Sequence, residues 1–221
     1  MLKLIIGNKA YSSWSLRGWL AAKQSGLQFE EITVPMFDEE WDKRTQGDEF
    51  APSAGKVPIL WDDKTVIWDS LAIIEWLADK TGRDRYWPKD DTARGMARSM
   101  AAEMHSSFAN LRREHSMNVR RRFPAQPLSP AVQADVERVV SLWAEARARH
   151  GGTGDYLFGD WNAVDIMFAP VVTRFVTYSI PLPRFAASYG EAVIAHPDVR
   201  AWLEAAQEEP WVIEKFETPV Q

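Results

Sequence analysis

Strand-like patterns are confined to the first third of the chain, and this asymmetry limits the folds available to it. Four short apolar runs there suggest β-strands: Leu2–Ile6, Phe29–Val34, Val57–Trp61 and Thr65–Trp68. Beyond them the amphipathic stretches all have helical composition: Thr92–Asn118, Pro130–His150, Ala163–Tyr178, Arg184–Ala195 and Pro197–Gln207. The sequence therefore predicts an α/β unit followed by an all-helical unit.

The first unit has the element order of a strand–helix–strand crossover. Residues Trp14–Ser25 carry apolar side chains at helical spacing, and Gly26 ends that helix. The crossover predicts that the first two strands are parallel. The last two strands flank the turn Asp62–Lys64 as a hairpin, and Asp69-Ser70 caps a further helix.

The boundary between the units lies near residue 85, in a charged stretch that holds Gly82 and Pro88. We expect the α/β domain over residues 1–82, a linker over 83–90 and the helical domain over 91–221. A length of 221 residues with 46% hydrophobic and 26% charged residues fits two small globular domains.

Composition removes several function classes. The chain has no cysteine, which excludes disulfides, thiolate metal sites and a cysteine nucleophile. A net charge of −5 argues against a general nucleic-acid binder. No apolar run approaches the ~20 residues that cross a bilayer, and the first apolar run is too short for an export signal. We therefore expect a cytoplasmic protein that binds no membrane.

A serine-rich segment, Tyr11–Arg17, stands where the first loop meets the first helix. A helix N-terminus has unpaired N–H groups and the positive end of the dipole, so it stabilises an anion. A serine hydroxyl there can donate to that anion. A plain N-cap serine accounts for the same pattern, and the segment by itself favours that interpretation.

The dipeptide Val57-Pro58 opens the third strand. Proline cannot donate to a sheet ladder, so it indicates an edge or a bend. A cis bond would turn the Val57 backbone outward, where it can pair with an extended peptide. A trans bond is the more frequent case, because only about 5–6% of X–Pro bonds are cis.

Two further segments precede helices. Asp69-Ser70 is a good cap, but its residues also suit an amino-acid head: the Ser70 hydroxyl and the helix N–H groups hold a carboxylate, and Asp69 meets an ammonium. Asn162–Asp165 has the spacing of a capping box, and we assign it to folding.

In this order the features resemble a cytosolic glutathione transferase over essentially the whole chain, and the serine motif is similar to that of the zeta class. The resemblance implies a thioredoxin-like domain, an all-helical domain and glutathione as co-substrate. It implies a glutathione site with these members: Ser12 as the catalytic serine, Pro58 as the cis-proline, Asp69 and Ser70 at the γ-glutamyl end, Lys43 at the glycyl end, and Ser13 and Val57 beside them.

The chain departs from the zeta pattern within that motif. Trp14 stands where zeta enzymes carry a cysteine, and Leu16 stands where they carry an aromatic residue. The helix-six folding motif of the family is matched by Asn162–Asp165. The expectation is therefore a serine-type transferase that is nearest in motif to the zeta class.

The resemblance also implies the chemistry. A thiol with a pKa of about 8.5 is mostly protonated at neutral pH, and a hydroxyl donor at a helix N-terminus lowers that pKa. Ser12 is expected to donate to the glutathione thiolate and not to act as a nucleophile, with Ser13 or Ser15 as substitutes. We assign the tryptophans to the core.

The second substrate, a small electrophile, is expected between the domains, against the helix that begins near Thr92. Arg113, with Arg112 or Asn118, would receive an anionic electrophile, although a solvated basic face explains the same arginines. No histidine pair has metal-site spacing, so we predict no metal. The resemblance implies a homodimer.

A non-catalytic member of the same fold is the alternative function. Such a protein would bind a hydrophobic ligand or a protein partner. The set of Ser12, Val57-Pro58 and Asp69-Ser70 favours the enzyme, because a binding module needs few of these residues. Conjugation, isomerisation and peroxide reduction all stay open for it.

Overall fold

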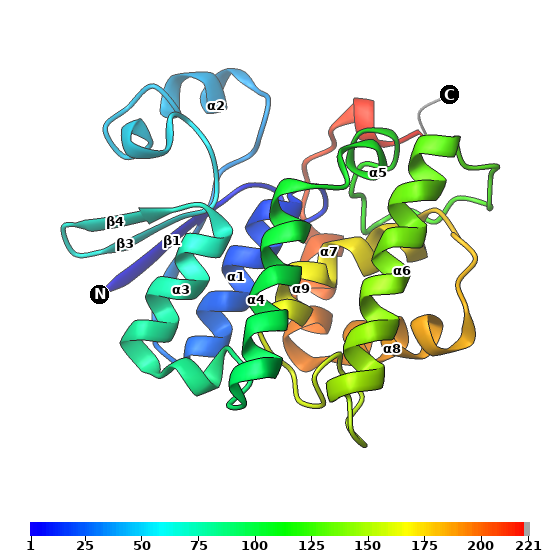
Figure 1. Cartoon of the computed structure of the whole chain (residues 1–221). Helices are drawn as coiled ribbons and strands as arrows, with labels where there is room; N and C mark the ends of the chain where they lie inside the picture. Colours follow the sequence, from blue (N-terminus) through cyan, green and yellow to red (C-terminus); the bar gives the residue numbers. More distant parts are fainter. Residues whose placement is uncertain (219–221) are drawn as a thin grey trace.

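A four-stranded sheet occupies the N-terminal part of the computed structural model, which describes residues 1–218 (Figure 1). Its strands are β1 (Leu2–Ile6), β2 (Phe29–Thr33), β3 (Ile59–Asp62) and β4 (Thr65–Trp68), in the order β2-β1-β3-β4. Strand β1 is parallel to β2, whereas β1–β3 and β3–β4 are antiparallel. The predicted crossover and hairpin are confirmed.

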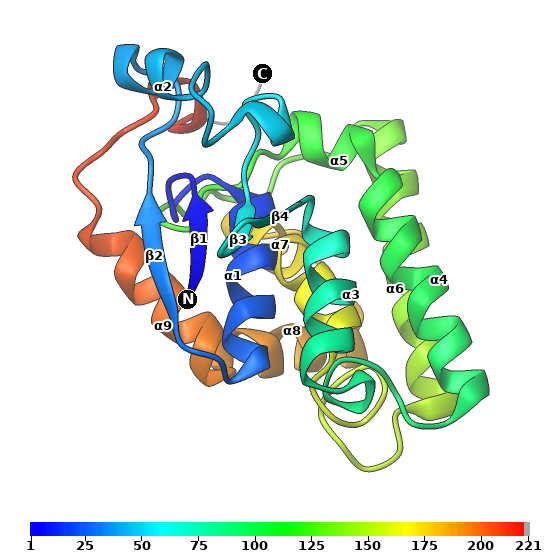
Figure 2. The same ribbon diagram turned by 90° about the vertical axis from the view of Figure 1, so that its left-hand side faces the viewer.

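Helices α1 (Ser13–Ser25) and α3 (Ser70–Thr81) pack together on one face of this sheet (Figure 2). Alternate residues of β1 point to opposite faces, so Leu4 and Ile6 join the main core while Ile5 joins a smaller cluster. That cluster includes Phe50, from the segment that carries α2 (Glu39–Arg44) and the 3-10 helix η1 (Ala51–Ser53). The sheet is therefore covered on both faces.

Six helices follow: α4 (Asp91–Ser106), α5 (Ala109–Glu114), α6 (Pro130–His150), α7 (Ala163–Thr177), α8 (Arg184–Ala195) and α9 (Pro197–Glu208). Nearly every residue of α7 is buried, and this helix contacts α1, α4 and α8. One hydrophobic cluster runs from the sheet through α1 and α7 to α6 and α8. The fold class is confirmed: an α/β unit joined to an all-helical unit.

The segment between the two units is packed and not loose. It holds the 3-10 helix η2 (Arg83–Arg85), and Tyr86 and Trp87 after it are buried. The Tyr86 hydroxyl donates to the carbonyl of Ala21 at 2.6 Å, and the Tyr86 carbonyl accepts from the N–H of Ala163 at 2.8 Å. The predicted boundaries, with an α/β domain over 1–82, a linker over 83–90 and a helical domain over 91–221, stay a prediction.

The expectation of one helix over Thr92–Asn118 was wrong. Helix α4 ends at Ser106, and Phe108 has a φ of 61°, which no regular helix accommodates. Phe108 is buried there, and the N–H of Leu111 in α5 donates to Asp135 of α6 at 2.9 Å. Contacts with a distant helix therefore fix a break that no glycine or proline announces.

No helix within residues 1–218 is both long and apolar enough to pass through a membrane.

The capping box at the start of α7 is present as expected. The Asn162 side chain accepts from the N–H of Val164, and the Asp165 carboxylate accepts from the N–H of Asn162 at 2.9 Å. Asp165 also accepts from the Leu157 N–H and from the Tyr189 hydroxyl. Burial raises the pKa of the Asp165 carboxyl to about 7, so this cap is part of the core.

Replacing Asp165 with alanine is expected to lower the free energy of unfolding by about 3 kcal/mol, because it removes a cap and leaves buried donors unpaired. Urea denaturation measures the change. Asp160→Ala is the matched control: its side chain is exposed in the same loop, and the loss there should stay below about 0.5 kcal/mol. Equal losses in the two variants would contradict the assigned role.

Candidate functional site

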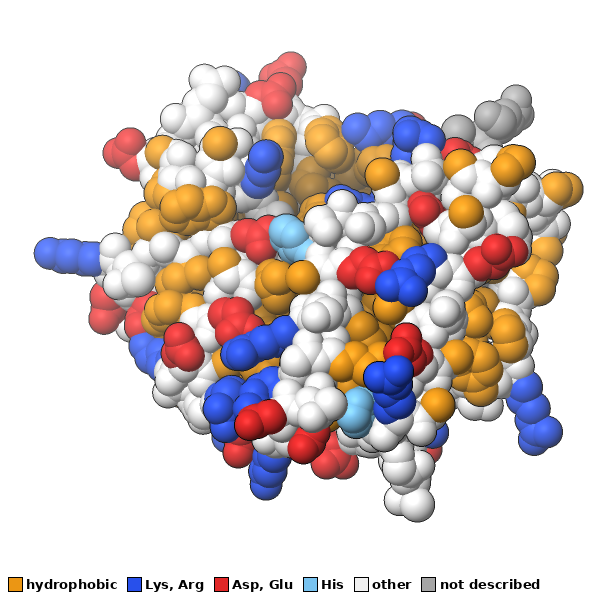
Figure 3. Space-filling model, in the orientation of Figure 1, with side chains coloured by type: hydrophobic (Ala, Val, Ile, Leu, Met, Phe, Trp, Pro, Cys, Tyr) orange, Lys and Arg blue, Asp and Glu red, His pale blue; other side chains and the backbone are white. Residues whose placement is uncertain are grey.

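A cavity of about 780 Å³ opens where the first turns of α1 and α3 meet the chain that enters β3. Figure 3 shows the surface hollowed below the lobe that carries α2. Five of the residues expected to bind glutathione line this one cavity: Ser12, Val57, Pro58, Asp69 and Ser70. The chain brings them together from three separate segments.

Ser12 is the N-cap of α1, and its hydroxyl belongs to a short chain of hydrogen bonds. Its Oγ lies 2.8 Å from the Oγ of Ser15 and accepts from the Ser15 N–H at 3.3 Å. The Ser15 Oγ in turn accepts from the N–H of Gly7 at 2.9 Å. Ser15 is sealed inside the protein, whereas Ser12 reaches the cavity wall.

The Val57–Pro58 bond is cis, as the family resemblance implies. Helix α1 packs directly on this proline at Gly18. A Cβ atom at Gly18 would lie 2.6 Å from Cγ of Pro58, closer than carbon atoms approach each other. Only glycine at this position lets the start of β3 lie so close to α1.

Asp69 and Ser70 are adjacent in the chain but differ in their hydrogen-bond partners. Asp69 caps α3 through Oδ1, which accepts from the Leu71 N–H at 2.9 Å, and its Oδ2 lies 2.6 Å from Nε2 of His105 in α4. Ser70 is 1% exposed, and its hydroxyl has no hydrogen-bond partner within residues 1–218. Asp69 thus already has protein partners, while the Ser70 hydroxyl has capacity for a ligand.

The other predicted site residues lie elsewhere. Lys43 is exposed on α2 and is not part of the cavity wall, where the lysine is Lys56. Ser13 and Arg113 line a second cavity of about 430 Å³ between the start of α1, α5 and Arg174 of α7. Neighbouring serines of one helix end therefore face different cavities.

Trp14 lies at the border of these cavities. Its side chain lines the first cavity, and two guanidinium groups lie over its ring. The ring centroid is 4.6 Å from Cζ of Arg17 and 4.5 Å from Cζ of Arg112, and Arg112 lines the second cavity. The indole therefore lines the first cavity, and its cation–π partner Arg112 lines the second.

Two family models match the chain: the glutathione S-transferase N-terminal domain over residues 11–80 and its C-terminal domain over residues 126–205. Together the two matches span more than half of the chain. The chain belongs to the glutathione S-transferase family.

Individual relatives agree with this assignment. The chain is 24% identical to glutathione S-transferase GstB of Escherichia coli K12 over 169 residues, 75% of this chain and 76% of that protein. It is 22% identical to glutathione S-transferase L1 of Arabidopsis thaliana over 193 residues, 85% and 71% of the two chains. A glutathione transferase homolog from Burkholderia, solved with bound glutathione, has a TM-score of 0.71 at 25% identity and covers 94% of this chain and 99% of its own.

Sequence reasoning missed several wall residues of this glutathione S-transferase family member. Trp14, Trp41 and Trp68 line the first cavity, although tryptophans were assigned to the core. Lys56 had a usable signal, since it directly precedes Val57-Pro58. His105 had none, because only the packing of α4 beside α3 brings it to Asp69. Within residues 1–218 no group of three or more His, Asp or Glu could hold a metal ion.

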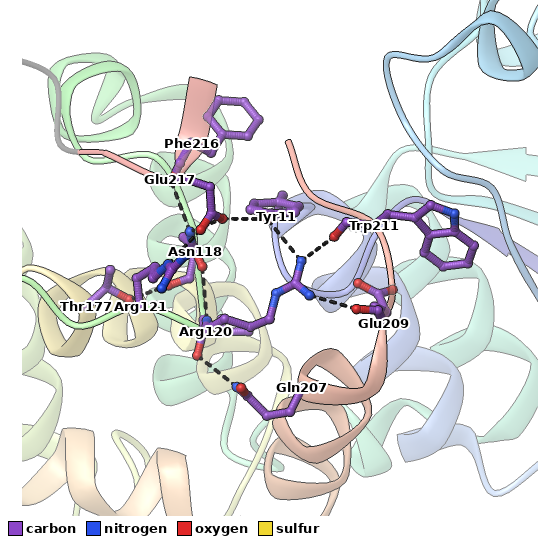
Figure 4. A network of polar contacts seen from close by, with 11 residues as sticks. Tyr11, Asn118, Arg120, Arg121, Thr177, Gln207, Glu209, Trp211, Phe216 and Glu217 are labelled. Atoms are coloured by element: carbon purple, nitrogen blue, oxygen red, sulfur yellow. Dashed lines mark hydrogen bonds and ion pairs between the residues drawn. The ribbon is translucent and has the colours of Figure 1, made fainter. Parts of the chain in front are cut away.

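The C-terminal segment of the chain also holds the loop that leads into α1. Residues 209–217, here called the C-terminal strap, run from α9 back to the loop before Ser12 and include the 3-10 helix η3 (Glu214–Phe216) (Figure 4). Glu209 accepts from the Lys9 N–H at 2.7 Å, and Glu217 accepts from the Tyr11 hydroxyl at 2.6 Å. The strap thereby fixes the loop that positions Ser12.

Arg120 holds the strap at its centre. Its Nη1 donates to the carbonyl of Glu209 at 2.7 Å, and its Nη2 donates to the Tyr11 hydroxyl at 2.9 Å and to the carbonyl of Trp211. Figure 4 shows these bonds converging on one guanidinium group. The strap therefore depends on a residue that lies about ninety positions earlier in the chain.

Arg120→Leu is expected to release the strap and to speed tryptic cleavage after Lys215 by about tenfold, because local opening becomes easier by about 1.4 kcal/mol. Mass spectrometry of timed digests measures this rate. Arg122→Leu is the matched control, since Arg122 is exposed and makes no hydrogen bond within residues 1–218. Unchanged cleavage in Arg120→Leu would rule out the anchoring role.

Proposed function

We propose that this protein is a glutathione-dependent transferase of the serine type. Glutathione binds in the first cavity, and Ser12 stabilises its sulfur as a thiolate for attack on a small electrophile. The observation that carries this proposal is the convergence of Ser12, Val57-Pro58 and Asp69-Ser70 on one cavity. Membership of the glutathione S-transferase family, and the bound glutathione named for the Burkholderia homolog, support it.

The γ-glutamyl end of glutathione is a zwitterion, and the start of α3 offers a partner for each charge. Its carboxylate is proposed to accept from the unpaired Ser70 hydroxyl, next to the positive end of the α3 dipole. Its ammonium faces the Asp69 carboxylate, whose side chain is 40% exposed beside His105. The ligand would thus replace solvent at Asp69 and supply the missing partner of Ser70.

The rest of the tripeptide lies along the chain that precedes β3. The Val57 backbone can pair with the cysteinyl residue as an added strand would. The glycyl carboxylate needs a cation, and we assign that role to Lys56, because it lines the cavity whereas Lys43 does not. Lys56 thus takes the role that the sequence led us to expect for Lys43, a cation that pairs with the glycyl carboxylate.

Ser12 can donate a hydrogen bond to the glutathione sulfur while its own oxygen still accepts one. When its proton points to the thiolate, the Ser15 hydroxyl can rotate to donate to Ser12 Oγ, and the Gly7 N–H still donates to Ser15 Oγ. Each bond in such a chain polarises the next. Every unit by which the thiol pKa falls corresponds to about 1.4 kcal/mol of preference for the thiolate. The thiol proton leaves to solvent.

Several narrower features belong to the proposal. Nearness to the zeta class rests on the serine motif, and the electrophile reaction is conjugation, isomerisation or peroxide reduction. A homodimer, which the family resemblance implies, and a cytoplasmic location complete the proposal. The non-catalytic alternative is separated from it by glutathione binding to the wild type, which is measured with the second variant below.

Ser12→Ala is expected to lower kcat/KM with chlorodinitrobenzene by about 10–100-fold, the scale of losing one donor to a developing anion. The ultraviolet titration of bound thiolate should shift to higher pH by about one to two units. Ser129→Ala is the matched control, because Ser129 likewise caps a helix, α6, but lies outside the cavity. A loss in Ser13→Ala with none in Ser12→Ala would transfer the role to Ser13.

Ser70→Ala is expected to weaken glutathione binding by about tenfold while kcat at saturation changes less than about twofold, because a hydrogen bond to a charged group is lost away from sulfur. Isothermal titration calorimetry measures the dissociation constant. An analogue without the α-carboxylate of the glutamyl residue should bind wild type and variant equally. If wild type binds no glutathione at all, the non-catalytic alternative replaces the enzyme.

A further inference from the structure

Three guanidinium groups gather beside the second cavity, and the acceptors of two of them, Arg17 and Arg174, are backbone carbonyls. Arg17 is 1% exposed and Arg174 is 4% exposed. Arg17 donates to the carbonyls of Met167 at 2.8 Å and Ser13 at 3.3 Å, and its Nη2 has no partner within residues 1–218. Arg174 donates to the carbonyls of His115 and Pro170, both at 3.0 Å. Among the described residues neither side chain forms an ion pair with a carboxylate.

Arg112 is the third member of this cluster. Its guanidinium is half-buried over the Trp14 ring and forms no ion pair within residues 1–218. Burial and the nearby Arg112 charge lower the pKa of Arg174 to about 10, which leaves it protonated at neutral pH. Burial and the charges of Arg174 and Arg112 also lower the pKa of Arg17, and the charge of Asp69 opposes them only in part. Within residues 1–218 no carboxylate forms an ion pair with the cluster, so its positive charge has no contacting acid.

Arg113, the arginine singled out from the sequence, is not part of this cluster. Its side chain is 67% exposed and reaches Glu114 at 3.3 Å and Asn110 at 2.9 Å. Its charge is therefore compensated and hydrated. The cations that line the second cavity without an acidic partner in the described part of the chain are Arg112 and Arg174.

We propose that the second cavity binds the carboxylate of the electrophile, held directly by Arg112 and Arg174. This inference rests on the proposed function and names its substrate class: small aromatic or unsaturated carboxylic acids. A carboxylate matches the fork of a guanidinium and relieves the repulsion between the two arginines. Arg17 acts as a positioning residue, because it bonds to the Ser13 carbonyl and adds charge from behind Trp14.

The remaining wall of the second cavity suits such an acid. Ser13 and Ser116 offer hydroxyl groups, and Met117 and Phe216 offer apolar surface for the ring or chain of the substrate. A volume of about 430 Å³ lies at the small end of ligand pockets, which span about 300–1,000 Å³. Since Ser12 and Ser13 are adjacent, the acid would lie next to the thiolate site.

The test reaction is substitution on 4-chloro-3-nitrobenzoate. The glutathione sulfur forms a bond to the ring carbon that carries chlorine, the carbon–chlorine bond breaks, and chloride leaves with the bonding electrons. The thiol proton goes to solvent, and no oxidant or reductant takes part. The methyl ester of the same acid is the neutral comparison, and each rate is divided by the uncatalysed rate with glutathione.

Wild type is expected to prefer the acid over the ester by at least about tenfold in kcat/KM, the scale of one charged contact. Arg112→Met should lower kcat/KM for the acid, mainly through KM, by about 10–100-fold more than it lowers kcat/KM for the ester. Arg112→Lys should recover part of the loss, because it restores the charge without the fork. Arg149→Met removes an exposed charge outside the cavity and should change neither substrate.

Calorimetry of 4-chloro-3-nitrobenzoate without glutathione tests the carboxylate site apart from catalysis. Binding to wild type that weakens about tenfold in Arg112→Met, but not in Arg149→Met, supports the inference. No binding to wild type, or equal turnover of acid and ester, overturns it. Turnover of neutral chlorodinitrobenzene without acid preference leaves the proposed function intact, whereas absence of glutathione binding defeats that function by itself.

Discussion

Helix α1 lies against the sheet, α3 and α7, and both cavities depend on this placement. Its core side chains, such as Leu16 and Leu20, are completely or almost completely buried, so the helix cannot rotate without exposing them. Its first turn projects Ser12 toward one cavity and Ser13 toward the other. Burial of a single helix thus fixes one wall residue of each cavity at once.

Trp14 directly follows those two serines in the chain. Its indole explains how two arginines lie close together. Over an aromatic face a guanidinium regains part of the hydration energy that it loses on burial, because the ring quadrupole attracts the cation. Arg17 and Arg112 both use the same ring. A cysteine at this position, as in the zeta motif, could not hold them in that arrangement.

Local signals predicted the parts that local physics decides. The strands, the crossover, the Gly26 end of α1 and the capping box at Asn162 all follow from spacing within a few residues. Ser12, Pro58 and Ser70 were singled out because each stands at a turn into a helix or strand, and they line one cavity. The family resemblance supplied the statement that these turns meet.

Long-range contacts decided what the sequence did not reveal. The break at Phe108 depends on Asp135 of α6, and the packed segment at Tyr86 depends on α1 and α7. Choosing between Lys43 and Lys56 needs the path of the chain around α2, which leaves Lys43 outside the cavity wall. No pattern near Arg120 announces that it anchors residues ninety positions later. Such features come from topology, and a single sequence carries little trace of them.

The C-terminal strap bears on the charge of the second cavity. It brings Glu217 close to the same end of α1, where a carboxylate with free oxygens would help to neutralise the arginines. Its oxygens are already used, however, by the Tyr11 hydroxyl, by Asn118 and by Arg121 at 2.6 Å. The strap also adds Phe216 to the cavity wall, which lowers the access of water and counter-ions to that side. The arginines therefore have no contacting acid within residues 1–218, and a carboxylate bound in the second cavity is the compensating charge that we propose.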